Sequence, residues 1–383
     1  MPRDFLFTSE SVNEGHPDKV CDQIADAVLD CLLAQDSASR VAVECMISTG
    51  SVHVAGEVTT SGYADVQKIA RGVLRDVGYD NPEFGIDWQD AGVWVSLHEQ
   101  SSEIAHGVGG GQGRAPGAGD QGIMFGFACD ETPELMPLPI MAAHRLCMRL
   151  AEVRRQRLIP DLGPDGKSQV TVEYRGGRPA RIASVVIAQQ HGRSIVESRL
   201  RREIVDLVIR PVCGSLFDDG TVTYINAAGT FTVGGPEADT GVTGRKVVSD
   251  SYGGMARNGG GAMSGKDPTK VDRSGAYAAR WMAKNIVAAG LARRCEIQLS
   301  YVIGEPSPTG IFIDAFGTGD ETRLEKLVRA VFPLTPSQII SALDLMRPVY
   351  RKTAVFGHFG RLDPEFTWER TDKADALRKE AGL

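Results

Sequence analysis

One pattern of apolar residues recurs three times along this chain of 383 residues and constrains its fold more than any other feature. Each copy has apolar residues at helical spacing, then two alternating stretches joined by a short turn, then a second helical stretch. The first helices of the copies are predicted to start at Pro17, Pro139 and Asp272. The copies share no obvious sequence identity, so the repeat is one of pattern. Coincidence is the alternative, because helices and hairpins are common.

The pattern predicts six helices and three hairpins. The helices should cover residues 17–34, 64–77, 139–155, 194–210, 272–289 and 322–332. The hairpin strands should cover residues 41–47 and 52–60, 168–174 and 181–190, and 295–303 and 311–316. We expect an α+β fold of three α/β domains, in which each sheet is largely antiparallel or mixed and carries helices on one face. The other face of each sheet needs a cover, for which a partner subunit is the natural candidate.

Glycine-rich joints set the expected domain boundaries. A first domain should span residues 3–102, a second 116–233, and a third 235–372. The segment at about 101–119 lies between the first two domains and is rich in glycine. A long segment of this composition inside a compact protein is typical of an active-site lid. An interdomain linker is the competing interpretation.

Composition excludes several functional classes. The formal net charge is −7, whereas a general nucleic-acid binder needs a basic face. No apolar run reaches the roughly 18 residues that a membrane span requires, and the first residues contain no hydrophobic stretch long enough to predict a signal peptide. The seven cysteines are an odd number without a Cys-x-x-Cys pair, which favours reduced thiols and a cytoplasmic location. The motifs of hydrolytic triads, zinc catalysis and dinucleotide binding are missing.

The segment Gly15-His16-Pro17-Asp18-Lys19 is the first candidate site. Proline at a first helical position indicates a helix start, so His16 should lie just before a helix N-terminus and Asp18 in its first turn. Free backbone N–H groups and the positive end of the helix dipole attract phosphate to such a place. His16 would donate to a phosphate oxygen and Asp18 would hold magnesium. The alternative is that Asp18 only complements the helix dipole.

A glycine-rich stretch at residues 259–265 is the second candidate site. Its Gly-x-x-x-x-Gly-Lys spacing ends at Lys266, but Asp267 stands where a P-loop needs Ser or Thr, and no buried strand precedes it. We therefore interpret the stretch as an anion cradle outside the P-loop fold. Lys270 and Asp272 follow at a helix start, and this combination suits a triphosphate with magnesium. A flexible linker is the alternative.

Two further cationic segments belong to the candidates. Asp239 is followed, after glycines, by the adjacent cations Arg245 and Lys246. Asp165 and Lys167 flank a glycine on a predicted turn. A lysine on a turn is usually only solvated, so Lys167 is a weak candidate when taken alone.

Several long motifs in the correct order make the chain resemble the S-adenosylmethionine synthetases, also called methionine adenosyltransferases, over nearly its whole length. The motifs are Glu14-Gly-His-Pro-Asp-Lys19, Gly117-Ala-Gly-Asp-Gln-Gly122, Gly234-Gly-Pro236, Thr243-Gly-Arg-Lys246, Tyr252-Gly-Gly254 and Ser264-Gly-Lys-Asp-Pro268. The resemblance implies an enzyme that converts ATP and L-methionine to S-adenosylmethionine and splits the tripolyphosphate to pyrophosphate and phosphate. It also implies three domains with approximate threefold pseudosymmetry, and a homodimer with shared active sites that assembles into a homotetramer.

By motif match, the resemblance implies roles for the candidate residues. The catalytic residues would be His16, Lys167, Arg245 and Lys266. ATP would be bound by His16, Asp165, Lys167, Thr230, Phe231, Asp239, Arg245, Lys246, Ala262 and Lys266. Methionine would be bound by Glu57, Gln100, Asp120, Asp239 and Lys270. Two Mg²⁺ ions per site would bind through Asp18 and Asp272, and K⁺ through Glu44.

One departure from the family pattern lies just before the Gly-Gly-Pro motif. Family members usually read Pro-x-Gly-Arg-Phe there, whereas this chain reads Ala227-Ala-Gly-Thr-Phe231, so Thr230 replaces an arginine. Asn258 and Met263 also replace more usual residues beside the cradle. Three alternatives stay open: the same chemistry with an altered methionine-analogue or nucleotide preference, a non-catalytic regulatory relative, and a different ATPase or kinase.

Overall fold

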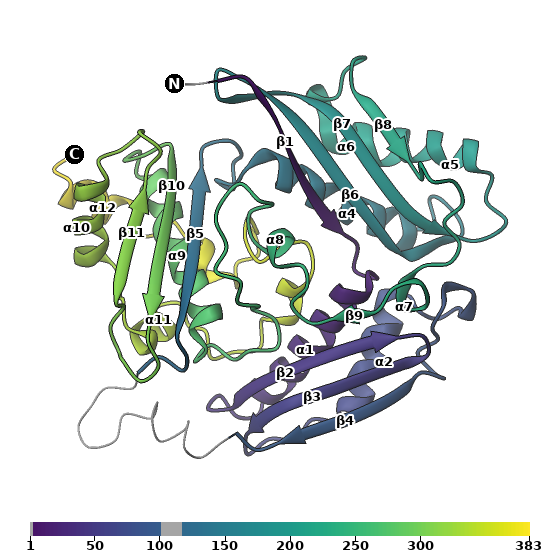
Figure 1. Cartoon of the computed structure of the whole chain (residues 1–383), viewed down its shortest axis with the longest axis horizontal. Helices are drawn as coiled ribbons and strands as arrows, with labels where there is room; N and C mark the ends of the chain where they lie inside the picture. The colour runs from purple at the N-terminus through teal and green to yellow at the C-terminus, as the bar shows by residue number, and fades with distance from the viewer. Residues whose placement is uncertain (1–2, 101–116) are drawn as a thin grey trace.

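The computed structural model of the protein describes residues 3–100 and 117–383, in which three sheets carry helices (Figure 1). The helices are α1 (Pro17–Leu33), α2 (Val66–Val77), α4 (Leu138–Arg155), α5 (Glu197–Ile204), α6 (Arg210–Cys213), α7 (Gly235–Ala238), α8 (Val247–Asp250), α9 (Val271–Ala288), α10 (Glu321–Val331), α11 (Pro336–Ala342) and α12 (Ala374–Glu380). The strands are β1 (Phe5–Val12), β2 (Arg40–Ser48), β3 (Ser51–Thr59), β4 (Gly92–His98), β5 (Gly122–Cys129), β6 (Leu162–Arg175), β7 (Arg178–His191), β8 (Val222–Ile225), β9 (Gly241–Val242), β10 (Arg294–Tyr301) and β11 (Gly310–Asp314). Within these ranges, no helix is both long and apolar enough to cross a membrane.

The three sheets exchange strands in a cycle. Their strand orders are β4-β3-β2-β9, β8-β7-β6-β1 and β11-β10-β5. In each sheet the hairpin comes from one copy of the repeat, and the strand beside the first hairpin strand comes from another copy. Each of the ranges 3–102, 116–233 and 235–372 thus lends its first strand to a neighbouring sheet. The repeat seen in the sequence is therefore a structural repeat whose copies are interlocked, while the domain ranges themselves stay a prediction.

The sheets combine antiparallel and parallel pairs. The hairpins β2–β3, β6–β7 and β10–β11 are antiparallel, and so are the exchanged strands. The pairs β3–β4 and β7–β8 are parallel, because a helix separates the two strands of each pair in the sequence. The expected α+β fold with antiparallel or mixed sheets is confirmed.

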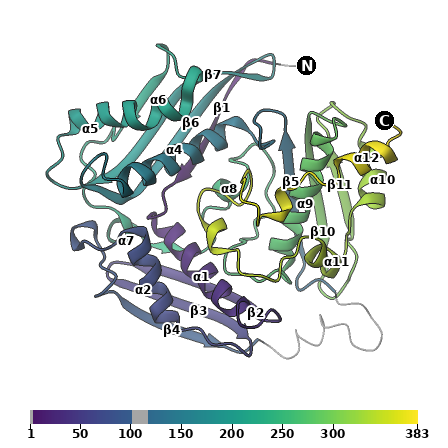
Figure 2. The ribbon, with the colours of Figure 1, turned by 180° about the vertical axis from the view of Figure 1, so that it is seen from behind.

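The helices cover one side of the sheets and leave the other side open. Figure 1 shows the sheets toward the viewer, and Figure 2, from behind, shows α1, α2, α4, α5 and α9 in front of them. Apolar residues at helical spacing on α1, such as Val20, Ile24 and Val28, are fully buried in the core. On β2 the apolar residues alternate toward this core, while Glu44 and Met46 face away from it.

The sequence did not predict β1, and its buried face explains why. The side chains at alternate positions that turn inward are Phe5, Phe7, Ser9 and Ser11. The two serines are buried because the Ser9 hydroxyl donates to the Gly253 carbonyl at 2.8 Å and the Ser11 hydroxyl lies 2.8 Å from a ring nitrogen of a buried histidine. Half of the inward face is thus polar, and the apolar alternation that signals a strand is lost.

Some element bounds differ from the expected ones, and one expectation lies mostly outside the described residues. The helix expected at 194–210 begins at Glu197 and is interrupted by a π-helical turn, Val205–Ile209, ahead of α6. The strand expected to reach residue 316 ends at Asp314. The predicted lid at 101–119 lies outside the described residues except for its last part, from residue 117.

Candidate active site

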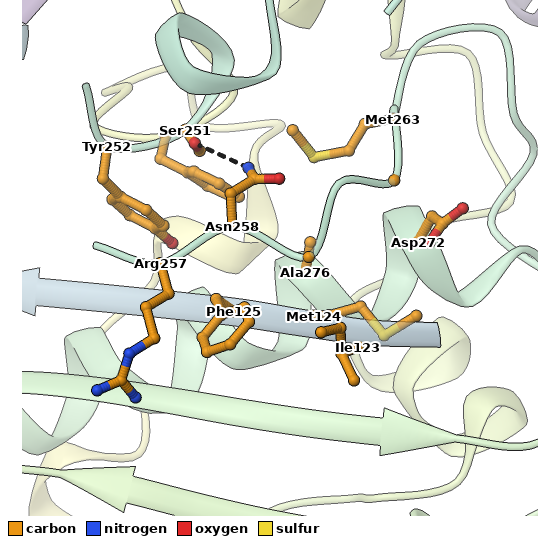
Figure 3. A pocket seen from close by; sticks show the side chains of 13 residues that line it. Ile123, Met124, Phe125, Ser251, Tyr252, Arg257, Asn258, Met263, Asp272 and Ala276 are labelled. Carbon is orange, nitrogen blue, oxygen red and sulfur yellow. Dashed lines mark hydrogen bonds between the residues drawn. The ribbon is translucent and has the colours of Figure 1, made fainter. Parts of the chain in front are cut away.

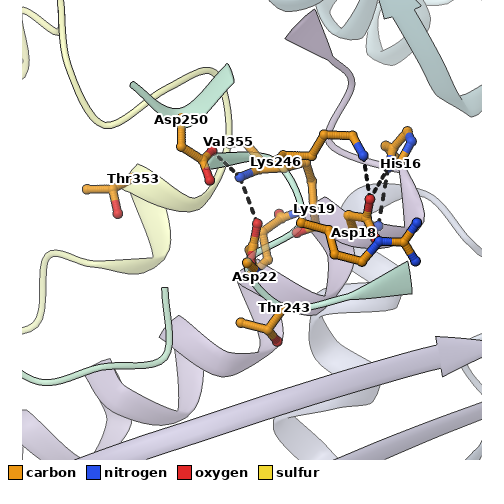
Figure 4. Close-up of polar contacts among 12 residues, drawn as sticks. His16, Asp18, Lys19, Asp22, Thr243, Lys246, Asp250, Thr353 and Val355 are labelled. Carbon is orange, nitrogen blue, oxygen red and sulfur yellow. Dashed lines mark hydrogen bonds and ion pairs between the residues drawn. The ribbon is translucent and has the colours of Figure 1, made fainter. Parts of the chain in front are cut away.

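His16 is held at the N-terminus of α1 by a closely packed turn (Figure 4). Glycine is required at position 15, because a Cβ atom there would lie 2.4 Å from the Pro164 carbonyl oxygen. The His16 ring is buried, and its Nδ1 accepts a hydrogen bond from the backbone N–H of Asp18 at 3.2 Å. This bond assigns the proton of the neutral ring to Nε2. His16 therefore lies just before the helix, as the sequence predicted; its side chain also caps the helix and keeps one N–H donor available.

Burial and neighbouring cations keep the His16 ring neutral. Burial is the largest cause that lowers the pKa of His16 from its ordinary value of 6.5 to about 3, and Lys246 and Lys167 lower it further. Asp18 opposes them with a smaller effect. A ring that is neutral throughout the physiological range can donate its Nε2–H to an anionic oxygen and does not change its charge there.

The Asp18 carboxylate connects α1 to the loop that carries Arg245 and Lys246. Its Oδ1 accepts from the Val242 N–H at 2.9 Å and lies 3.6 Å from Arg245 Nε. Its Oδ2 lies 2.5 Å from Lys246 Nζ. Burial alone would raise the pKa of Asp18, but the bonds from Lys246 and Val242 outweigh it and the pKa is lowered. Asp18 therefore stays ionised and is fixed in place.

Asp165 and Lys167 approach the same place from β6. The Asp165 side chain is buried, its Oδ2 accepts from the Gly235 N–H at 2.9 Å, and its Oδ1 has no partner among the described residues. Burial raises the pKa of Asp165 to about 6. The exposed Lys167 pairs across the strands with Val12, at the end of β1. We call His16, Asp18, Asp165, Lys167, Arg245 and Lys246 the His16 group.

Phe231 and Asp239 flank the Gly-Gly-Pro turn beside the His16 group. The ring edge of Phe231 would lie 2.9 Å from a Cβ atom on Gly234, which shows how closely it packs on the turn. The charge of the exposed Asp239 contributes to the raised pKa of Asp165, so the two carboxylates are near each other. The structure therefore brings both predicted residues to this group.

A second set of candidates surrounds Lys266. Lys266 Nζ lies 2.6 Å from Asp272 Oδ2 in the first turn of α9, and Lys270 forms an ion pair with Asp267. A β-bridge joins Lys266 to Ala42 of β2, and Ala42 pairs in turn with Glu57 of β3. Two strand spacings place Lys266 and Glu57 about 10 Å apart in one row of the sheet.

Asp120 and Gln100 lie beside this second set. A Cβ atom on Gly119 would lie 2.8 Å from the Thr269 carbonyl oxygen, next to Lys270 in the sequence, so Asp120 is close to it. The Gln100 N–H donates to Thr59 Oγ1 at 3.3 Å, two residues after Glu57. We call Glu57, Asp120, Lys266, Lys270 and Asp272 the Lys266 group. It contains most of the residues predicted to bind methionine.

The stretch 259–265 is a closely packed cradle against the Lys266 group. A Cβ atom on Gly261 would lie 2.2 Å from Asp272 Oδ1, and one on Gly265 would lie 1.9 Å from a backbone oxygen of β2. Figure 3 shows the pocket beside the cradle, which Asp272, Met263 and Asn258 line together. Asn258 Oδ1 accepts from the N–H of Gly260 at 2.6 Å. Two of the departures from the family pattern therefore lie in the wall of this pocket.

The two groups lie at opposite ends of the same edge of β2. Val242, which binds Asp18, pairs with Met46, whereas Lys266 pairs with Ala42. Four residues of strand separate these positions by about 13 Å. Glu44, predicted to bind K⁺, lies between them on β2. Ala262, in the glycine cradle, lies close to the His16 group. A Cβ atom on Gly244, which directly precedes Arg245, would lie 2.5 Å from Ala262 Cβ.

Comparison with known families agrees with this arrangement. The N-terminal domain of S-adenosylmethionine synthetase matches residues 4–102, the central domain 115–231 and the C-terminal domain 233–370. The three matches together cover nearly the whole chain. The chain belongs to the S-adenosylmethionine synthetase family. It therefore has methionine adenosyltransferase activity and makes S-adenosylmethionine from ATP and methionine, as its motifs indicated.

S-adenosylmethionine synthetases need Mg²⁺ and K⁺. The acidic residues of this protein offer single carboxylates to such ions. The described residues contain no cluster of three or more His, Cys, Asp or Glu side chains that could hold a metal. Mg²⁺ usually binds through one or two carboxylates together with waters and substrate phosphates. Asp18 and Asp272 each offer one carboxylate beside a lysine, which fits ions that are shared with a triphosphate.

Thr230, which replaces the arginine usual in S-adenosylmethionine synthetases, is tied to α5. Its hydroxyl lies 2.9 Å from Glu197 Oε1, and the other oxygen of Glu197 lies 3.3 Å from Arg201 Nη2. The loop before it turns at Asn226 and Gly229, with φ values of 44° and 100°. The position thus carries a neutral side chain that is engaged with an acidic residue.

Sequence reasoning missed the side chains that hold the cation-bearing loops of this synthetase. Asp22 and Asp26 follow Asp18 at four-residue spacing and are fully buried. They accept hydrogen bonds from Gly244 N–H at 2.9 Å and Gly265 N–H at 2.8 Å. The available signal was an aspartate on every fourth residue of a helix that otherwise reads as apolar, because a buried acid needs a dedicated partner.

Proposed function

We propose that the methionine sulfur attacks C5′ of ATP directly. The sulfur–carbon bond forms as the bond from C5′ to oxygen breaks, and tripolyphosphate leaves with the electron pair. A thioether carries no proton, so the step needs alignment and anion stabilisation but no general base. The observation that supports this mechanism is the neutral, fixed His16 donor among Lys167, Arg245 and Lys246. Water then splits the tripolyphosphate into pyrophosphate and phosphate.

The His16 group would bind the nucleotide. His16 Nε2–H donates to the triphosphate next to C5′, and Lys167, Arg245 and Lys246 bind phosphate oxygens through charge-assisted hydrogen bonds. Lys266 of the Lys266 group also binds a phosphate oxygen. Asp165 accepts a hydrogen bond from the nucleoside with its free Oδ1, because a buried acceptor without a partner is costly. Phe231 stacks on the adenine, and Thr230, Asp239 and Ala262 complete the walls.

The Lys266 group would bind the amino acid. Methionine carries an ammonium group, which Glu57, Asp120 and Asp239 can pair with, and a carboxylate, which Lys270 can pair with. Gln100 contributes an amide that accepts or donates. Two carboxylates, Asp18 and Asp272, would hold Mg²⁺, and Glu44 would help to hold K⁺. These cations supply positive charge to the leaving tripolyphosphate.

We infer a homodimer with shared active sites that pairs into a homotetramer. Met46 and Trp94 are 41% and 56% exposed on the open face of the first sheet, which also carries Glu44 and Glu57. A second copy over this face would cover its apolar side chains and bring further site residues to the two glutamates. All seven cysteines are free thiols, which supports a reducing, cytoplasmic environment.

Isotope transfer tests the proposed attack on carbon. With ATP that carries ¹⁸O in the bridge between C5′ and the α-phosphorus, all of the label should appear in pyrophosphate and phosphate, and S-adenosylmethionine should form in equal amount. Mass spectrometry of the products measures both, and a reaction without methionine is the control. ADP or AMP as the methionine-dependent product would contradict the proposal and indicate a kinase or another ATPase.

The alternative of an altered nucleotide preference predicts a gain of function at position 230. Thr230→Arg should raise kcat/KM for ATP by about 3- to 30-fold, because one charge-assisted contact is worth about 1.5–3 kcal/mol and neighbouring cations already compensate in part. The KM for methionine should change less. Thr230→Gln is the matched control, since it adds length without charge. No gain in kcat/KM for ATP, as expected if the new arginine pairs only with Glu197, would contradict this prediction. So would a gain confined to methionine. Either result would mean that Thr230 does not weaken phosphate binding.

A further inference from the structure

A series of four aspartates on one face of α1, of which the first three are buried and the last is half-buried, accepts hydrogen bonds from backbone N–H groups of distant segments. The series is Asp18, Asp22, Asp26 and Asp30, spaced by four residues. Their partners are the N–H groups of Val242, Gly244, Gly265, Tyr350 and Arg351, at 2.8 to 2.9 Å. Every one of these five N–H groups lies in the range 235–372. This face of α1 therefore holds the backbone of the loops that carry Arg245, Lys246 and Lys266.

Asp26 forms the most completely enclosed ion pair of the series. Asp26 and Arg273 are both 0% exposed, and the guanidinium meets the carboxylate with two parallel bonds of 2.7 and 2.9 Å. All five N–H donors of Arg273 find acceptors, the other three being the oxygens of Lys266, Thr353 and Tyr277 at 3.0 to 3.1 Å. No shorter or less branched cation can make this set of bonds.

This ion pair holds the backbone on both sides of the Gly265–Lys266 peptide. Asp26 Oδ1 accepts from the Gly265 N–H at 2.8 Å, and Arg273 Nη1 donates to the Lys266 carbonyl at 3.0 Å. Arg273 also follows Asp272 directly in the first turn of α9. One buried pair thus fixes both members of the Lys266–Asp272 contact.

A parallel arrangement holds the other cation-bearing loop (Figure 4). Lys19 bridges Asp22, at 2.8 Å, and Asp250. Asp22 Oδ1 accepts from the Gly244 N–H at 2.9 Å, and the Asp250 N–H donates to the Lys246 carbonyl at 2.8 Å. Asp22 therefore anchors this loop from α1 as Asp26 anchors the other, while the bond on the far side of Lys246 is a backbone bond at the start of α8.

We propose that Asp26 and Arg273 are positioning residues for the reaction, which preset Lys266 and Asp272 for the triphosphate and its metal ion. The inference rests on the roles proposed above for Lys266 and Asp272. Stability alone is a poor reason for this pair, because apolar residues of similar volume often replace buried ion pairs without loss of stability. Placement of charge is a better reason, since an error of about 1 Å can reduce a rate about 100-fold.

Arg273→Lys tests the proposal, because lysine keeps the charge beside Asp26 but has only three donors and no fork. We expect the affinity for Mg²⁺-tripolyphosphate, measured by titration calorimetry, and kcat/KM for ATP to fall about 10- to 100-fold. The Mg²⁺ concentration needed for half-maximal activity should rise as well.

Arg280→Lys is the matched control. Arg280 lies two turns further along α9, is also 0% exposed and pairs with Glu369 through two bonds, but its other partners are backbone oxygens of β5 and the following loop. We expect it to lower the melting temperature as Arg273→Lys does, while tripolyphosphate affinity and the Mg²⁺ requirement stay within twofold of the unchanged enzyme.

Equal effects of Arg273→Lys and Arg280→Lys on tripolyphosphate affinity and Mg²⁺ requirement would overturn the proposal and leave a purely structural ion pair. If Arg273→Lys does not fold, Thr353→Val decides, since it removes one anchor of Arg273 and keeps the ion pair. We then expect about a 3- to 10-fold loss of tripolyphosphate affinity, and no loss contradicts the proposal. Normal tripolyphosphate binding by Lys266→Met would instead show that the proposed role of Lys266 is wrong.

Discussion

Lys266→Met is expected to lower kcat at least about 100-fold while the protein stays folded. In the free enzyme Lys266 Nζ lies 2.6 Å from Asp272 Oδ2 at the mouth of the glycine cradle, and the side chain is about a quarter exposed. A charge-assisted contact to the leaving phosphates is worth about 1.5–3 kcal/mol, which corresponds to about 10- to 150-fold in rate. Loss of the lysine also leaves Asp272 without its partner, which adds repulsion against the triphosphate.

Steady-state kinetics with circular dichroism and thermal melting separate this effect from unfolding. Lys326→Met is the matched control, because Lys326 is exposed on α10 and belongs to neither group. It should keep normal kcat. A folded Lys266→Met enzyme with kcat within threefold of the unchanged protein would remove Lys266 from the proposed phosphate site.

Helices and hairpins were predictable because their burial is one-sided. On α1 the apolar residues recur at helical spacing, and on β2 they alternate. The spacing of apolar residues therefore identifies each element as a helix or a strand. The first strands of the copies could not be predicted in this way. β1 turns two serines inward, and β5 is buried almost throughout, so neither shows a simple alternation. The cyclic exchange of strands also depends on contacts over long sequence distances, which no local pattern carries.

Residue types and motifs located both halves of the candidate site, but their separation in one chain needed the structure. His16 and Lys266 are each flanked by glycine and acidic residues in the sequence, and nothing there says whether they meet. The register of β2 shows that they do not meet within one chain, since Val242 pairs at Met46 and Lys266 at Ala42. This separation is one reason for the proposed sharing of sites between copies.

The supporting ion pairs were invisible for a different reason. Asp26 and Arg273 lie far apart in the sequence, and an aspartate in a helix is normally read as solvated. Only the full enclosure of both side chains shows that their charges must be paired.

His16→Ala should lower kcat by about 100- to 1000-fold, the range found when one donor to a developing anion is removed. The Nε2–H of His16 is available because Nδ1 is occupied by the Asp18 N–H. His16→Asn should recover part of the loss, since its amide oxygen can cap the helix while its NH₂ donates to the leaving group. The KM for methionine should change less than kcat in either variant, because most of the residues proposed to bind methionine lie in the Lys266 group.

The pH profile distinguishes a neutral donor from an acid–base catalyst. The pKa of His16 is about 3, lowered first by burial and then by the charges of Lys246 and Lys167, so the ring stays neutral at every pH above that value. The His16 ring should therefore add no inflection near 6.5 to the kcat profile. Any inflection that Asp165 causes, with its pKa of about 6, should persist in His16→Asn, whose profile should run parallel at a lower level. An inflection near 6.5 that disappears in His16→Asn would mean that the ring titrates during turnover, and the proposed role of His16 as a fixed neutral donor would be wrong.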